Sequence, residues 1–154
     1  MHPSFTGKFL IKNSKLLECS NYNFDSVPEI ISVYEVIRII ENTPLFLEDN
    51  LGRLMNSIYL INRKPAVSFS GIANEIHILS EQNKISNGNV KIICNFLPKT
   101  NVPDSVVLFF IPHQYPVREK YLEGIKMQSL VLERPNPNAK LINSSMTQEV
   151  SGLK

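Results

Sequence analysis

The sequence has little of several residue types on which binding sites are commonly built. It contains two cysteines, three histidines and no tryptophan. Cys19 and Cys94 lie too far apart in sequence for a zinc knuckle or a redox pair, and the histidines share no ligand spacing. Both cysteines stand beside apolar or β-prone residues. We therefore expect buried free thiols and no metal site, with a single disulfide between the two as the alternative.

Charge of one sign and long apolar runs are also lacking. The formal net charge is +2, and no basic run interleaved with aromatic residues is present, so we expect neither nucleic acid nor an acidic membrane as a partner. No apolar run approaches the roughly 20 residues of a bilayer-spanning helix. The opening MHPSFTGKFLIKNSK lacks the basic and apolar regions of a signal peptide. These features favour a soluble cytoplasmic protein.

Glycine is sparse as well. The six glycines are scattered, and none belongs to a Gly-rich phosphate loop or to a Gly-x-Ser-x-Gly nucleophile elbow. The sequence therefore gives no support for a phosphate-loop nucleotide site or for a serine hydrolase of that type.

The residues that are present predict one globular domain with strands on both sides of a helical pair. The 154 residues are 43% hydrophobic and 19% charged, which is enough to bury a core. KFLIKNSKLLE has apolar runs flanking Asn13-Ser14 and predicts a hairpin. SVYEVIRII predicts a strand, ENTP a turn and LFL a returning strand. GNVKIICNF, DSVVLFFIP and IKMQSLVLE are also predicted strands, the second apolar enough to be central.

The middle of the chain changes its hydrophobic period. Apolar residues recur every three or four positions and predict an amphipathic helix at Leu51, Leu54, Met55, Ile58 and Ile61. Glu48 and Asp49 stand at its expected start, where the helix dipole favours negative charge, and Pro65 is expected to close it. A second helix is predicted over SGIANEIHILSEQNK, with Ile72, Ile76 and Leu79 on one face, a helical turn at PVREKYLEG, and a further helix after Asn143.

The order of these elements predicts the fold class. Strands and helices do not alternate singly, which argues against a doubly wound nucleotide fold. The pattern predicts an α+β fold, an antiparallel sheet with two helices packed on one face.

Three motifs occur in order along the chain. The strand VYEVIR is followed by a turn and the helix opening EDNLGRL, and RPNPNAKLIN follows the last predicted strand. Together with the opening hairpin and NVKIICNF, they resemble the class IV (fold type IV) pyridoxal-phosphate enzymes. That family comprises branched-chain and D-amino-acid aminotransferases and aminodeoxychorismate lyase. Its strand has the form Val-Phe/Tyr-Glu-x-x-Arg/Lys and its helix opens as Glu-His-Leu-x-Arg-Leu, so Asn50 stands where a histidine is common. The resemblance covers nearly the whole chain.

The resemblance implies a cofactor, pyridoxal 5'-phosphate, and roles for three residues. Lys140 matches the lysine that forms a Schiff base with the cofactor. Arg53 matches the helix arginine that holds the cofactor phosphate, and Tyr34 matches the strand aromatic that faces cofactor and substrate. It also implies the fold of the family's N-terminal domain and, by analogy, a homodimer.

The chemistry of these residue types is consistent with the implied roles. A lysine amine loses its proton more easily when desolvated or near other cations, and it can then shuttle a proton at a substrate α-carbon. A guanidinium fork suits a phosphate dianion, and an arginine in the first turn of a helix lies near backbone N–H groups that attract anions. Without the resemblance, Lys140 and Arg53 are two of sixteen lysines and arginines, interpreted as surface charges, and Tyr34 is a packed strand aromatic. Lys91 is interpreted as a solvated strand lysine.

The length departs from the family pattern, because members continue into a second domain of similar size. We expect residues 1–132 to form the N-terminal α+β domain. Residues 133–154 are expected to form the interdomain loop and the start of a C-terminal domain whose remainder is absent. The expected function is transamination of an amino acid, of branched-chain or D-amino-acid type, with an amino-acid or 2-oxo-acid substrate. Aminodeoxychorismate lyase, or a non-catalytic domain that no longer binds the cofactor, stays open as an alternative.

Overall fold

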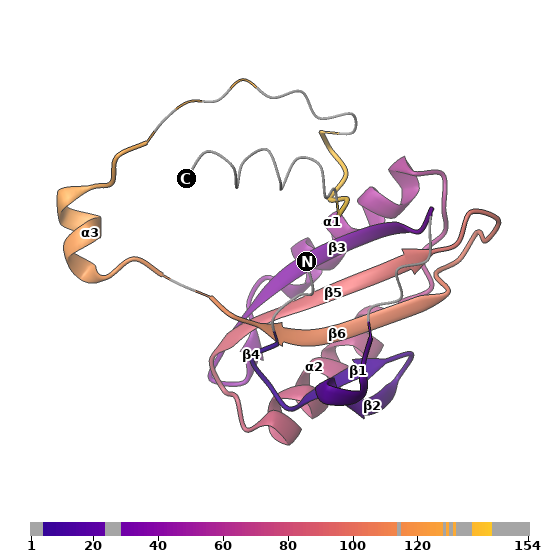
Figure 1. The fold of residues 1–154 in the computed structure, drawn as a ribbon, viewed down its shortest axis with the longest axis horizontal. Helices are drawn as coiled ribbons and strands as arrows, with labels where there is room; N and C mark the ends of the chain where they lie inside the picture. The colour runs from indigo at the N-terminus through magenta and orange to yellow at the C-terminus, as the bar shows by residue number, and fades with distance from the viewer. Residues whose placement is uncertain are drawn as a thin grey trace.

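The sheet is the frame on which the other elements are placed. The computed structural model describes residues 5–23, 29–113, 115–127, 129, 131 and 137–142. Within them, a six-stranded sheet has the order β2-β1-β6-β5-β3-β4, and all its pairs are antiparallel (Figure 1). The strands are β1 (Phe9–Lys12), β2 (Lys15–Glu18), β3 (Ile31–Ile40), β4 (Thr43–Pro44), β5 (Gly88–Phe96) and β6 (Ser105–Ile111). The predicted central position of β6 is confirmed.

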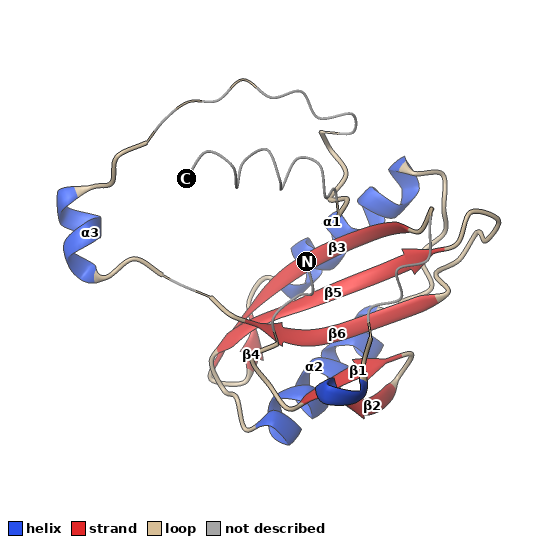
Figure 2. Ribbon diagram, viewed as in Figure 1, coloured by secondary structure: helices blue, strands red, loops and turns tan. Residues whose placement is uncertain are grey.

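Two helices cover one face of this sheet. They are α1 (Leu47–Leu60) and α2 (Phe69–Asn83), and Figure 2 shows both passing behind the strands. Alternate strand residues point to this face because side chains alternate along a strand. They pack with the apolar stripes of the helices into one buried cluster that includes Val33, Ile37, Leu54, Ile76 and Ile92. The predicted α+β class, with two helices on one face, is confirmed.

The opposite face carries a smaller apolar cluster. Leu10, Ile93, Val107 and Phe109 are buried there, and Tyr34 packs against them. A short helix, α3 (Arg118–Glu123), lies apart from the sheet and has no buried residue (Figure 1). A 3-10 turn at Cys19–Asn21 follows β2. Cys94 is buried and Cys19 partly buried, and both thiols are free.

The connection between β3 and α1 corrects one expectation. LFL was expected to form the returning strand, but only Thr43–Pro44 pair with β3, and α1 begins at Leu47. Phe46 has a left-handed backbone (φ 50°) and is 74% exposed, so the chain turns into the helix at a point where a strand residue would have continued the pairing. The helix also ends at Leu60, five positions before Pro65, because Asn62 has a positive φ of 56° that a helix cannot continue.

The segment IKMQSLVLE corrects a second expectation, because it was predicted to form a strand. None of its described residues, Ile125–Met127, Ser129 and Val131, belongs to a strand. Ile125 is 65% exposed, Met127 87% and Val131 100%, so these side chains do not cover an apolar face of the sheet. A strand-like residue pattern alone therefore does not bring the segment to the sheet. The predicted helix after Asn143 lies outside the described residues. In the part of the chain that the structure describes, every helix is too short or too polar to cross a bilayer.

Candidate functional site

Lys140 is held against the free edge of β3. The backbone N–H of Tyr34 donates to the carbonyl of Lys140 (2.9 Å), and the N–H of Ile142 donates to the carbonyl of Ser32 (2.9 Å). An isolated antiparallel bridge pairs Val33 with Leu141. β5 pairs with one edge of β3 and β4 with the end of the other edge, at Ile39 and Ile40. The segment pairs with the part of that second edge that β4 leaves open, where strand N–H and C=O groups lack strand partners.

Helix α1 fastens the same segment from a second direction. Ser57 is buried, and its hydroxyl accepts a hydrogen bond from the backbone N–H of Lys140 (3.2 Å) while donating to the carbonyl of Arg53 (2.9 Å). Lys140 is therefore tied through its backbone to β3 and to α1. This double attachment fixes where its side chain starts.

The side chains of Lys140 and Arg53 meet at one carboxylate, that of Glu35. The Lys140 Nζ donates to Glu35 Oε1 and forms an ion pair with it. The Arg53 guanidinium contacts both oxygens, with Nε 3.2 Å from Oε2 and Nη2 3.3 Å from Oε1. The Glu35 side chain is fully buried, whereas that of Lys140 is 39% and that of Arg53 60% exposed. One buried carboxylate thus faces two partly exposed cations, so the cluster keeps an excess of positive charge toward solvent.

The ionisation of this cluster follows from those contacts. Burial acts to raise the pKa of Glu35, but hydrogen bonds from Arg53 and Lys140 outweigh it and hold that pKa below its ordinary value. The hydrogen bond and charge of Glu35 raise the pKa of Arg53. Glu35 is therefore a carboxylate at neutral pH, and Arg53 is a permanent cation.

Asn50 gives Arg53 its orientation. Its Oδ1 accepts from Arg53 Nη2 (2.6 Å), and its Nδ2 donates to the carbonyls of Leu45 (3.0 Å) and Phe46 (2.7 Å). The amide therefore links the guanidinium to the turn that opens α1. Because that helix begins at Leu47, Arg53 lies in its second turn, and the expectation that it stands in the first turn beside unpaired backbone N–H groups was wrong.

The two cations line one hollow of about 610 Å³. Its walls come from α1 and from the segment that carries Lys140, and they include Arg53, Asn56, Ser57, Leu60, Asn138 and Lys140. The hollow is lined by a primary amine and a guanidinium. Those are the groups that capture an aldehyde and a phosphate.

Tyr34 lies beside this cluster on the other face of β3. Its ring centroid is 5.8 Å from Lys140 Nζ and 4.6 Å from Lys91 Nζ. Lys91 is only partly exposed, and burial lowers its pKa. Lys91 thus stacks on an aromatic ring and is not the freely solvated strand lysine that was expected.

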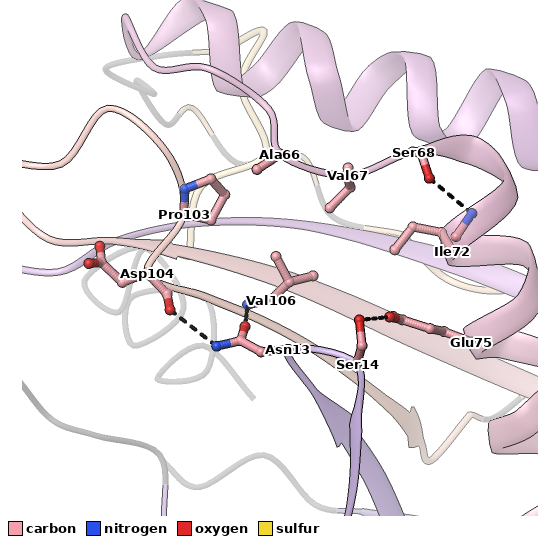
Figure 3. A pocket seen from close by; sticks show the side chains of 11 residues that line it. Asn13, Ser14, Ala66, Val67, Ser68, Ile72, Glu75, Pro103, Asp104 and Val106 are labelled. Carbon is pink, nitrogen blue, oxygen red and sulfur yellow. Dashed lines mark hydrogen bonds between the residues drawn. The ribbon is translucent and has the colours of Figure 1, made fainter.

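A second hollow, of about 350 Å³, lies at the β1–β2 turn (Figure 3). Ser14 donates to Glu75 of α2 (2.6 Å), and Asn13 exchanges hydrogen bonds with the N–H of Val106 (2.8 Å) and the carbonyl of Asp104 (3.3 Å). These polar groups fasten the hairpin to its neighbours. None of the predicted site residues lines it.

Comparison with known protein families matches most of the chain to one family. The model for amino-transferase class IV matches residues 32–149, which include Glu35, Arg53 and Lys140. The chain belongs to the class IV aminotransferases. Enzymes of this family depend on pyridoxal phosphate. A sequence comparison with curated proteins gives no match.

Solved structures of branched-chain amino acid aminotransferases share the fold. A Thermotoga maritima protein assigned to that activity is 16% identical, with a TM-score of 0.65 over 95% of this chain and 54% of its own. The Thermoproteus uzoniensis enzyme with norvaline is 15% identical, with a TM-score of 0.56 over 70% of this chain and 41% of its own. The Escherichia coli enzyme is 11% identical, with a TM-score of 0.59 over 70% of this chain and 42% of its own. The chain thus spans about half the length of these neighbours or less.

Glu35, Asn50 and Ser57 were not predicted as site residues. Glu35 carries a usable signal, because it is the one charged residue among the alternate positions Val33, Glu35, Ile37 and Ile39 that face the core. Asn50 and Ser57 are polar residues on the buried side of an amphipathic helix, which is a weaker signal of the same kind.

Proposed function

We propose that this chain contributes the cofactor-holding side of an aminotransferase site that transaminates an amino acid with pyridoxal 5'-phosphate. The observation that carries the proposal is the meeting of the Lys140 amine and the Arg53 guanidinium at one buried carboxylate, above a hollow that both line. These residues lie 105 and 18 positions from Glu35 in sequence.

Each residue has a role that its chemistry supports. Lys140 would bind the cofactor aldehyde covalently and carry a proton to and from the substrate α-carbon. Its backbone is fixed by a hydrogen bond to Ser57, and its side chain is partly exposed to solvent. Arg53 would hold the phosphate, because its fork is oriented by Asn50 and is 60% exposed. Tyr34 would face cofactor and substrate beside Lys140. Pyridoxal phosphate, when bound, supplies the electron sink for the reaction.

Several finer points belong to the same proposal. Residues 1–132 would be the N-terminal domain and 133–154 the interdomain loop and start of a second domain. The carboxylate that pairs with the ring nitrogen of the cofactor would be supplied by a residue outside those that the structure describes. A homodimer and a cytoplasmic location are expected by analogy with the family.

The substrate is proposed to be an amino acid of branched-chain or D-amino-acid type. The solved neighbours are branched-chain amino acid aminotransferases, which favours the first. Aminodeoxychorismate lyase and a non-catalytic domain are the readings that the experiment must exclude.

The experiment is a single-turnover amino-transfer assay. The chain is loaded with pyridoxal phosphate and mixed in turn with L-leucine, a D-amino acid and aminodeoxychorismate. Conversion of bound cofactor to pyridoxamine phosphate by an amino acid supports transamination. Pyruvate release from aminodeoxychorismate alone would make the protein a lyase, and absence of cofactor retention would make it non-catalytic.

One variant, with a matched control, tests the phosphate role of Arg53. Arg53→Ala should lower affinity for pyridoxal phosphate about 10- to 100-fold, the value of a charge-assisted hydrogen bond, with the Lys140 amine still present. Arg118→Ala, at an exposed arginine of α3, is the matched control and should leave the affinity for pyridoxal phosphate unchanged. Equal affinities for the two variants would refute the phosphate role.

A further inference from the structure

Glu35 occupies a place where an ionised group is costly. It lies on the core-facing side of β3 between Val33 and Ile37, and all three are 0% exposed. Taking a carboxylate out of water costs several kcal/mol unless donors replace the water. An apolar residue would fill this strand position without that cost, so the carboxylate calls for a specific explanation.

The donors around Glu35 are the site residues themselves. Oε1 accepts from Lys140 Nζ, from Arg53 Nη2 and from the backbone N–H of Val36 (3.0 Å), and Oε2 accepts from Arg53 Nε. The charge of Asp49 of α1 also raises the pKa of Arg53, and the amines of Lys91 and Lys140 lie 4.6 and 5.8 Å from the centroid of the Tyr34 ring. The carboxylate is therefore the point at which the two cations are joined.

We propose that Glu35 is a positioning residue of this site: its buried carboxylate holds the Lys140 amine and the Arg53 guanidinium together until a cofactor replaces it as their partner. This inference rests on the proposed function, and it assigns to Glu35 a role of its own within it.

The contacts give the proposal its physical content. An ammonium cannot attack an aldehyde, so capture would require Lys140 to leave Glu35 and release one proton to solvent, to which its side chain is 39% exposed. The new bond from the nitrogen to the aldehyde carbon would replace the carbonyl bond, and the aldehyde oxygen would leave as water. The Arg53 edge formed by Nε and Nη2 is engaged by Glu35, so a phosphate that takes this edge must displace the carboxylate. Asn50 retains Nη2 during the exchange.

Charge stays balanced when Lys140 departs. Until a phosphate takes its Nε–Nη2 edge, Arg53 remains beside Glu35 as a cation that does not deprotonate, so the carboxylate keeps a partner when the amine leaves first. With a glutamine at this position, the same cations would be held by a neutral amide. The ion pair that holds the Lys140 amine would then be lost, and the amine would leave this position more easily.

The test measures how fast the Lys140 amine reacts when no cofactor is present. The full chain is methylated with formaldehyde and cyanoborohydride over a pH series, and the modification of each lysine is read by peptide mass spectrometry. Glu35→Gln should raise the modification rate of Lys140 about tenfold at neutral pH, because it removes a charge-assisted hydrogen bond that holds the amine. Lys15, an exposed lysine of β2, is the internal reference and should not change.

Two further variants separate position from fold. Glu35→Asp keeps the charge but shortens the side chain by one methylene, so it should raise Lys140 modification less than Glu35→Gln does. Glu41→Gln removes an exposed carboxylate just after the same strand and should behave as wild type. If Glu35→Gln does not fold, as judged by circular dichroism, the Glu35→Asp result decides: wild-type Lys140 reactivity in that variant overturns the proposal.

A second reading separates this inference from the proposed function. The same proteins are treated with pyridoxal phosphate and borohydride, and the adduct on Lys140 is quantified. Suppose that wild type forms the Lys140 adduct and that the Lys140 methylation rate is the same with and without Glu35. This result overturns the positioning role and leaves the cofactor function supported. Reactivity that depends on Glu35, without any Lys140 adduct, overturns the cofactor function and with it the exchange proposed here.

Discussion

Asn50→Ala should destabilise the fold and loosen the site together. Asn50 is 8% exposed, and its amide makes three hydrogen bonds that join the turn before α1 to Arg53. The two bonds to the carbonyls of Leu45 and Phe46 are between neutral groups and contribute about 1 kcal/mol each. The bond to Arg53 adds about 0.5 kcal/mol, because that guanidinium is largely solvated. Alanine regains about 0.5 kcal/mol through its helix propensity.

The net expectation is a loss of about 2 kcal/mol in the free energy of unfolding. The assay is urea denaturation followed by circular dichroism, comparing midpoints at unchanged slope. Asn56→Ala, at an exposed asparagine on the same helix, is the matched control and should change stability by less than about 0.5 kcal/mol. Equal losses in the two variants would refute the conclusion that Asn50 fastens the start of α1.

Two other predictions concern ionisable groups away from solvent. Glu35 has a lowered pKa in the folded state, so its pairing contributes stability that is present above the unfolded value of about 4.3 and is lost as pH falls through the folded pKa. The difference in unfolding free energy between wild type and Glu35→Gln should therefore shrink as pH falls below about 4; a constant difference down to pH 2 would contradict it. Burial raises the pKa of the Cys94 thiol to about 12, so Cys94 should react with a disulfide reagent at pH 8 only after denaturant is added. Labelling mapped to Cys94 by peptide mass spectrometry in the native protein would argue against a closed core at β5.

Hydrophobic period alone predicted most of the sheet and both main helices. β3 is a run of β-branched and aromatic residues, and α1 has an apolar stripe at three- and four-residue spacing, so local chemistry and tertiary burial agree there. Where they disagree, the prediction was wrong. LFL has strand-like residues, yet Phe46 takes a left-handed backbone and faces solvent. IKMQSLVLE has a strand pattern, but its described residues lie away from the sheet that would have to pair with them.

The site was predicted less completely than the fold. Spacing cannot bring Lys140 to Arg53, because the contact depends on a segment that pairs with β3 although Lys140 lies 105 positions from Glu35 in sequence. The ordered resemblance to a family supplied that pairing of residues, and the structure places both at Glu35. Glu35 itself was passed over because a strand glutamate suggests a solvated side chain until its register shows that it faces the core.

Mapping of a borohydride-trapped adduct tests the proposed role of Lys140 most directly. The chain is incubated with a stoichiometric amount of pyridoxal phosphate, reduced, digested and sequenced by mass spectrometry. We expect the pyridoxyl group on Lys140 alone, and its loss in Lys140→Met but not in Lys15→Met. A label spread over exposed lysines, or one that persists unchanged in Lys140→Met, would contradict the proposal that this amine is the cofactor anchor.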